Sequence, residues 1–174
     1  ITRALGASSS ERGRRAAATQ ATQIAAAQGW TDSRAAFAWF ALGRLSLKTD
    51  PQAALRAFMK AGAIYRRTPG AGIQAAHVDM QMAAFALASG RAQDAIQLVN
   101  RSLSPAISGE NAALMATLYM IRAEGYDQLG NASQSRQARL DMAQWARYGF
   151  GSDAAVKRRA SEVAALADAG ARVN

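Results

Sequence analysis

The sequence predicts an all-α protein in which about eight helices pack as antiparallel neighbours. Ala dominates the apolar residues, only 3 of the 174 residues are Pro, and runs of β-branched residues are absent, which together favour helix over strand. Hydrophobic residues make up 50% of the chain, so a chain of this length can bury one sizeable core. The breaks between the expected helices are short, so consecutive helices must run antiparallel.

The first helix boundaries follow from capping residues. Gly29 stops the first helix, and Asp32 supplies an N-cap oxygen for the second, because such an oxygen accepts from the free N–H groups of the first turn. Asp50 and Pro51 open the third helix with a capping carboxylate and a proline at the position where its missing N–H costs nothing. After a TPGAG loop, the fourth helix ends at Gly90, a residue suited to the left-handed C-terminal position.

The second half of the chain is divided in the same way. Pro105 and the SGE segment end the fifth helix, Gly130 ends the sixth, and a YGFG turn separates the seventh from a last helix capped by Ser152 and Asp153. The expected helices cover residues 11–28, 33–47, 51–67, 73–89, 92–103, 110–129, 132–147 and 152–169.

A 40-residue interval runs through these helices. It relates three pairs of neighbouring residues, Leu42–Gly43, Met82–Ala83 and Arg122–Ala123. It also relates three residues in turns, Asp50, Gly90 and Gly130. Two antiparallel helices approach closely only where one of them offers a small residue. We therefore expect a notch at Gly43, faced by Ala54 and Ala61 of the next helix. The larger residues around that notch are Trp39, Leu42 and Phe58.

This pattern resembles the tetratricopeptide repeat, whose paired helices carry an aromatic, Leu-Gly, Ala, an aromatic and Ala at characteristic positions. The first unit carries the match in Trp39, Leu42, Gly43, Ala54, Phe58 and Ala61. Looser matches follow in Ala83, Gly90, Ala95 and Val99, and then in Tyr119, Ala123, Tyr126 and Gly130. The resemblance covers about residues 34–147 and implies a right-handed α-α superhelix.

The sequence departs from the family in its spacing. The interval is longer than the family repeat of about 34 residues, so longer links are expected between hairpins. The alternative to the family fold is an ordinary helical bundle with Ala-rich interfaces.

The resemblance implies a groove that binds a peptide or a protein surface. Transferred by register, the groove positions are Phe37, Phe40, Arg44, Lys48, His77, Met80, Gln81, Ala84, Thr117, Met120, Glu124 and Asp127. Phe40 and Met80 have core packing as their alternative, and Phe85 is assigned to the core. Phe40 stands where the family's carboxylate-binding members carry a clamp lysine, which argues against that type of receptor.

Residues for catalysis or metal binding are missing from the sequence. The chain has no Cys and one histidine, His77, so no metal pair and no catalytic triad can form from these types. TPGAG lacks the Lys-Ser/Thr of a phosphate loop. Glu124 and Asp127 share a helical face, which is more typical of a solvated surface than of a cation site. We expect no catalytic residue, cofactor or metal, and no enzyme activity.

The net charge of +9 favours acidic partners, although 18 of the 21 basic residues are Arg, as in chains from GC-rich bacterial genomes. Two basic clusters stand near the ends: Arg12, Arg14 and Arg15, and Lys157, Arg158 and Arg159. They suggest an alternative function in binding nucleic acid or an acidic partner. The favoured interpretation of the last helix is a polar cap, with an apolar stripe of Val156, Ala160, Val163, Ala164 and Leu166. That stripe also leaves a homodimer open.

The sequence therefore predicts a non-enzymatic bacterial adaptor or scaffold. Residues 11–170 are expected as one domain between tails at 1–10 and 171–174, with repeat-like units at 34–67, 74–104 and 114–147 and a capping helix at 152–169. Every apolar run is shorter than the roughly 18 residues that a membrane-spanning helix needs, so no membrane span is expected. The lack of Cys and the start at Ile1 favour an exported protein over a cytoplasmic one.

Overall fold

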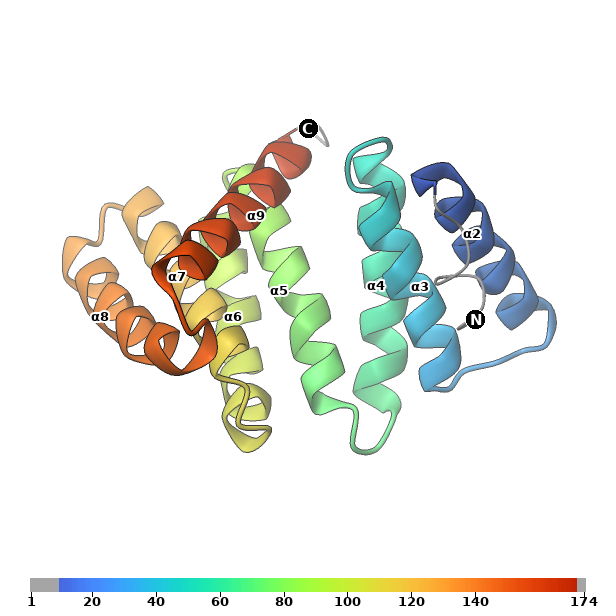
Figure 1. Ribbon diagram of the computed structural model, residues 1–174, viewed down its shortest axis with the longest axis horizontal. Coiled ribbons are helices and arrows are strands. Elements are labelled where there is room, and N and C mark those ends of the chain that lie inside the picture. Colours follow the sequence, from blue (N-terminus) through green and yellow to red (C-terminus); the bar gives the residue numbers. More distant parts are fainter. Residues whose placement is uncertain (1–9, 172–174) are drawn as a thin grey trace. The chain divides into compact units, whose positions relative to one another are not determined.

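The computed structural model describes residues 10–171, with side chains described for residues 10–164. Over this range the chain is all-helical and contains no strand (Figure 1). The helices are α2 (Glu11–Ala27), α3 (Ser33–Ser46), α4 (Pro51–Arg67), α5 (Gly72–Ala88), α6 (Ala92–Ser108), α7 (Ala112–Gln128), α8 (Ala132–Gly149) and α9 (Asp153–Ala171). The predicted all-α fold class is confirmed.

The chain divides into two compact units, Ile1–Val78 and Asp79–Asn174, with the division inside α5. We call them unit 1 and unit 2. Unit 1 contains α2, α3, α4 and the first turns of α5, and unit 2 contains the rest of α5 and α6 to α9.

In unit 1, α2 packs against α3, and α3 packs against α4. The second contact is close because Gly43 has no side chain: a Cβ built there would lie 2.6 Å from Cε1 of Phe58, a fully buried residue. Gly62 plays a similar part between α4 and α5, since its Cβ would lie 3.2 Å from Cγ1 of Val78. Small residues thus allow the close helix approach, as the spacing predicted.

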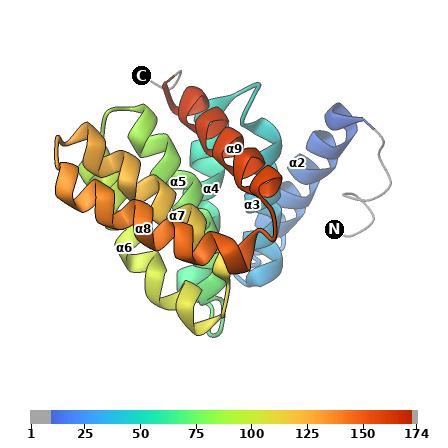
Figure 2. The same ribbon diagram turned by 60° about the vertical axis from the view of Figure 1, so that its left-hand side comes forward.

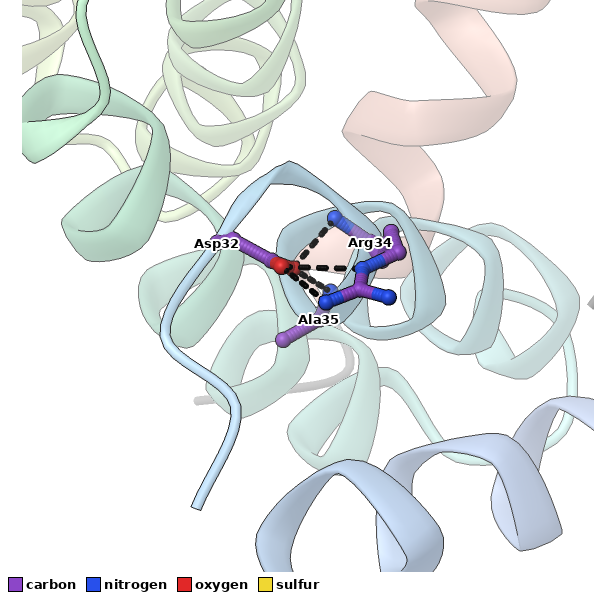
Figure 3. A network of polar contacts seen from close by, with 3 residues as sticks. All are labelled: Asp32, Arg34 and Ala35. Atoms are coloured by element: carbon purple, nitrogen blue, oxygen red, sulfur yellow. Dashed lines mark hydrogen bonds and ion pairs between the residues drawn. The ribbon is translucent and has the colours of Figure 1, made fainter. Parts of the chain in front are cut away.

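The start of α3 shows how local chemistry sets a helix boundary (Figure 3). Asp32 accepts hydrogen bonds from the backbone N–H groups of Arg34 at 2.9 Å and Ala35 at 3.4 Å. Its second carboxylate oxygen accepts from Nε and Nη2 of Arg34 at 2.8 and 2.6 Å. The side-chain bonds from Arg34 lower the pKa of Asp32 below its ordinary value. The predicted N-cap is confirmed, and Arg34 also lies over the ring of Trp30, 4.6 Å from its centroid.

In unit 2, an ion pair joins α5 to α6, and the later helices pack directly against one another. Buried Asp79 of α5 accepts two hydrogen bonds from Arg101 of α6, both at 2.6 Å, a paired geometry that is among the stronger ones available to these groups. Helix α6 packs against α7, and α7 against α8. Helix α9 contacts α7, and it turns sharply away from the end of α8 in both ribbon views (Figures 1 and 2).

Two glycines allow the backbones of unit 2 to approach. A Cβ on Gly125 of α7 would lie 3.0 Å from Cγ1 of Ile96 on α6. A Cβ on Gly149, the last residue of α8, would lie 2.4 Å from the backbone nitrogen of Ala113 on α7. Because a backbone cannot rotate away as a flexible side chain does, Gly149 is the position of this unit least able to accept a side chain.

The turns between helices recur at a regular interval. Gly70, Gly90, Glu110 and Gly130 all have positive φ, of 75°, 69°, 51° and 70°. At the last three, the next residue donates its backbone N–H to a carbonyl five positions earlier: Arg91 to Ala86, Asn111 to Ala106 and Asn131 to Tyr126. This is the Schellman arrangement of a helix C-terminus. The 40-residue interval in the sequence therefore reflects two equal helix-and-turn steps, each half that length.

Three details differ from expectation. The fifth predicted helix does not end before Pro105 but continues to Ser108, because the completely buried Ala106 packs its last turn against the core. The links between hairpins are not long: residues 68–71 and 109–111 join successive pairs, so the long interval comes from long helices. Finally, the three atoms nearest to the missing Cβ of Gly43 all belong to Phe58, rather than to Ala54 or Ala61.

The other predicted helices agree with the structure to within a few positions at each end. The expected tails lie almost entirely outside the described residues, which exclude 1–9 and 172–174.

Candidate interaction surface

Helix α3 and the turn that follows it present an aromatic and two cations on one face. Phe37 is 42% exposed, a high value for so large an apolar side chain, and Arg44 and Lys48 are exposed as well. Leu47, the C-cap, keeps helical dihedral angles, so Lys48 continues the helical register. At about 100° of rotation per residue, positions 37, 44 and 48 fall within about 40° of one another around the helix axis. These three residues, which we call the α3 face, were all among the predicted groove positions.

The two other unit 1 groove residues are less accessible. Phe40 is half-buried, and its ring packs at a tilt of 52° against that of Phe58, with 5.8 Å between the centroids. This contact makes Phe40 part of the α3–α4 core, the alternative considered for it. His77 near the start of α5 is also half-buried. The exposed aromatic of the predicted groove is therefore Phe37.

Four groove residues predicted in unit 2 are buried and do not line an open surface in this structure. Met80 retains 4% of its exposure and Gln81 8%, while Ala84 and Thr117 retain at most 1%. The hydroxyl of Thr117 donates to the carbonyl of Ala113 at 2.8 Å, within its own helix. Phe85, assigned to the core, is 1% exposed.

The remaining unit 2 groove residues lie on α7. Met120 is half-buried, and Glu124 and Asp127 are exposed. Asp127 is engaged with α8, because Arg139 donates a hydrogen bond to its carboxylate. A hydrogen bond from Ser135 and the bond from Arg139 lower the pKa of Asp127 below its ordinary value. Asp127 therefore connects two helices of unit 2, which agrees with a structural role and not with a cation shared with Glu124.

The N-terminal basic cluster lies beside the α3 face. Arg12, Arg14 and Arg15 of α2 are all exposed. Nη1 of Arg15 donates a hydrogen bond to Oγ1 of Thr49, the residue that follows Lys48. Two sets of residues that the sequence presented separately, one as a groove and one as a terminal cluster, thus adjoin in unit 1.

The C-terminal basic cluster lies on α9. Lys157 and Arg158 are exposed, and Arg159 donates to Glu162 at 2.6 Å. Opposite these charges, Val156 and Val163 are half-buried, while Ala160 and Ala164 are exposed. The side chain of Leu166 lies outside the described residues. The predicted apolar stripe is thus covered in part.

The net charge is concentrated in unit 1. Residues 1–78 contain 11 Lys and Arg against 3 Asp and Glu, a net charge of +8. Residues 79–174 contain the remaining 10 basic and 9 acidic residues, a net charge of +1. Both units contain nine Arg, so arginine-rich codon usage does not explain the difference. It arises because unit 1 has few acidic residues.

A cavity of about 450 Å³ lies between the end of α8 and the start of α9. Met142, Ala143, Ala146 and Val156 give it an apolar wall, and its polar groups come from Arg147, Ser152 and Asp153. The hydroxyl oxygen of Ser152 accepts from the N–H of Ala155 at 3.3 Å and so serves as a helix cap. Nothing in this set pairs a nucleophile with a base.

Neither a metal cluster nor a membrane span occurs in the described part of the chain. Over these residues, His, Asp and Glu side chains form no group of three or more that could hold a metal ion. Among the described helices, none has the length and apolar character needed to cross a membrane.

No model of a known protein family matches the chain, and no curated protein matches it. The likeness to the tetratricopeptide repeat therefore stays a resemblance, carried by the residues of the first hairpin.

Sequence reasoning missed two features of this surface. It selected Phe40 and Met80 as the central apolar groove residues, whereas Phe37 is the exposed one. The helical spacing of Phe37 to Arg44 and Lys48 was the available signal. It also missed the scarcity of acidic residues before residue 79, which a charge count by segment would have shown.

Proposed function

We propose that this protein is a non-enzymatic adaptor or scaffold that binds a peptide or protein through the α3 face. The observation that carries the proposal is the exposure of Phe37, 42% of whose surface faces solvent on the same helical face as Arg44 and Lys48. Single exposed apolar residues are ordinary on protein surfaces. Aromatic residues and Arg are both enriched at protein interfaces, and Phe37 and Arg44 bring one of each to this face.

The physical basis is the burial of Phe37 by a partner. Fully burying a Phe side chain contributes about 1.5–3 kcal/mol, so covering its exposed part contributes on the order of 1 kcal/mol. Phe37 is held on a helix that packs into the core through Ala35, Ala38 and Gly43. Little conformational entropy is lost when a partner covers a side chain so positioned.

The adaptor proposal also rests on the kind of architecture. Regular helix-and-turn steps, joined by short links, build a surface from successive helices instead of an enclosed reaction site. We further propose that the protein is not an enzyme, a proposal supported by the residue types: the chain has one His and no Cys.

The test compares Phe37→Ala with Met59→Ala as bait in pull-downs from lysate of the producing organism. Met59 of α4 is a matched control because it is also a large apolar side chain, 53% exposed, in the same unit. We expect a protein that is retained by the wild type and by Met59→Ala at high salt, but not by Phe37→Ala. Equal retention by all three, or equal loss from both variants, would refute binding at the α3 face.

A further inference from the structure

We infer that unit 1 carries a binding site for single-stranded nucleic acid, formed by Arg12, Arg15, Arg44 and Lys48, with Phe37 as a stacking platform. We call these four cations the basic surface. This inference goes beyond the adaptor function, because it concerns a different class of partner and depends on charge.

The basic surface is formed where α2 and α3 meet. Arg12 and Arg15 are three positions apart on α2 and therefore share a face. Arg15 donates to Thr49, next to Lys48, and Arg44 lies one helical turn before Lys48. The cations of the first turns of α2 therefore adjoin those at the end of α3.

These cations are not neutralised by any acid that the structure describes. None of the four forms an ion pair within the described part of the chain, whereas in unit 2 Arg91, Arg101, Arg139 and Arg159 all do. The acids of unit 1 are Glu11, Asp32 and Asp50. Asp32 pairs with Arg34, and Asp50 accepts from the N–H of Ala53 at 2.9 Å as the cap of α4. The basic surface is therefore open to the negative charge of a partner.

The exposed aromatic favours a single strand over other polyanions. Phe37 and Arg44 are separated by about 10 Å along the helix. A base can stack on the ring while the neighbouring phosphates reach the guanidinium, whose planar fork binds phosphate oxygens in pairs. In a duplex the bases are already stacked and cannot use the ring. An acidic peptide offers carboxylates but no flat ring in every residue.

The strength of this binding must depend on salt. For single strands the slope of log K against log salt is about −0.7 for each phosphate contact, so four contacts predict a slope of about −2.8. Between about 50 and 200 mM salt the affinity should fall roughly fifty-fold. Each cation removed should make the slope less negative by about 0.7.

The experiment measures fluorescence anisotropy of a labelled short oligo(dT) with the purified full chain at several salt concentrations. We compare the wild type with Arg44→Gln/Lys48→Gln and with Lys157→Gln/Arg158→Gln on α9. The second pair is a matched control, because it removes the same two units of charge from exposed positions in unit 2. Far-ultraviolet circular dichroism confirms that each variant is helical.

We expect Arg44→Gln/Lys48→Gln to lose affinity and about half of the salt slope. We expect Lys157→Gln/Arg158→Gln to keep the affinity and the slope of the wild type. Phe37→Ala should bind more weakly, with an unchanged slope. The inference is overturned if the wild type does not bind at low salt, or if both double variants lose affinity equally. It is also overturned if a duplex or a poly-glutamate of matched length binds more tightly than oligo(dT). Since only purified protein is used, these outcomes are independent of protein capture at high salt.

Discussion

The ring of Phe58 occupies the space that a side chain at Gly43 would need: Cε1 and Cδ1 lie 2.6 and 2.7 Å from the position of the missing Cβ. Phe58 is fully buried and also packs against Phe40. The ring therefore cannot move aside without disturbing a second aromatic. This single contact sets how closely α3 and α4 approach, and it explains why the first hairpin combines Leu-Gly on one helix with an aromatic on the next.

Gly43→Ala should destabilise the protein by about 1–3 kcal/mol through overpacking, as measured by urea unfolding, and Gly43→Leu should be worse. In a Phe58→Leu background the same change should cost less, because the smaller side chain leaves room for a Cβ. If the costs of Gly43→Ala and Phe58→Leu are simply additive in the double variant, the two residues do not share the space that the structure gives them.

Glu110 adopts a conformation that glycine occupies at the equivalent turns. Its φ is 51°, where Gly90 and Gly130 have 69° and 70°. A left-handed conformation costs a residue with a side chain about 1–2 kcal/mol, and the greater chain entropy of glycine offsets about 0.5–1 kcal/mol of that. Glu110→Gly should thus raise the free energy of unfolding by roughly 0.5–1 kcal/mol. Gly130→Ala should lower the free energy of unfolding. Urea unfolding measures both variants, and a Glu110→Gly variant less stable than the wild type would contradict this explanation.

Helix α6 lacks the side-chain N-cap that α7 and α8 have. Asn111 and Asn131 accept hydrogen bonds from the N–H groups of Leu114 at 3.0 Å and Gln134 at 3.2 Å, but Arg91 makes no such bond at the start of α6. Arg91→Asn should therefore stabilise the protein by about 1 kcal/mol. The substitution also removes the ion pair between Arg91 and Asp94, at 3.7 Å, but an exposed pair of this kind contributes little to stability.

The matched control for this cap is Asn131→Ala, which should lower the midpoint of thermal unfolding by removing the existing side-chain bond. No change in the midpoint for either variant would mean that these side chains do not cap their helices in solution.

The contact between Asp127 and α8 predicts a specific pH dependence. Hydrogen bonds from Ser135 and Arg139 lower the pKa of Asp127 in the folded state, so its contribution to stability is complete above the ordinary aspartate value of about 3.9. It is lost as the pH falls through the lower folded value. Asp127→Asn should therefore reduce the urea midpoint clearly at neutral pH and much less at a pH below the ordinary aspartate value.

Glu124→Gln serves as the control for this experiment, because Glu124 is an exposed carboxylate on the same helix. A constant difference between Asp127→Asn and the wild type across the same pH range would contradict the proposed contact.

Helix boundaries were predictable because they depend on neighbouring residues. Asp32 and Asp50 cap the helices they were expected to cap, and Gly90 and Gly130 adopt the expected positive φ. Pro105 was misjudged for a tertiary reason. Ala106 after it is completely buried, so packing holds the last turn of α6 together despite the lost hydrogen bond.

The candidate site was only partly predictable, because periodicity does not specify how a helix is rotated against its neighbours. Phe37 and Phe40 lie three positions apart and are equally plausible as groove residues, yet the contact with Phe58 turns one inward and leaves the other exposed. The hydrogen bond from Arg15 to Thr49 joins positions on different helical segments. Such a contact follows from the packing of α2 on α3 and has no signature in local spacing.

If a protein partner covers the α3 face in the cell, site-specific photocrosslinking will trap it there. A benzoylphenylalanine is placed at position 37, and as a control at position 59, in cells that naturally produce the chain. We expect a discrete crosslinked protein species from position 37 that is absent from position 59. No crosslink at position 37, or the same species from both positions, would contradict this expectation.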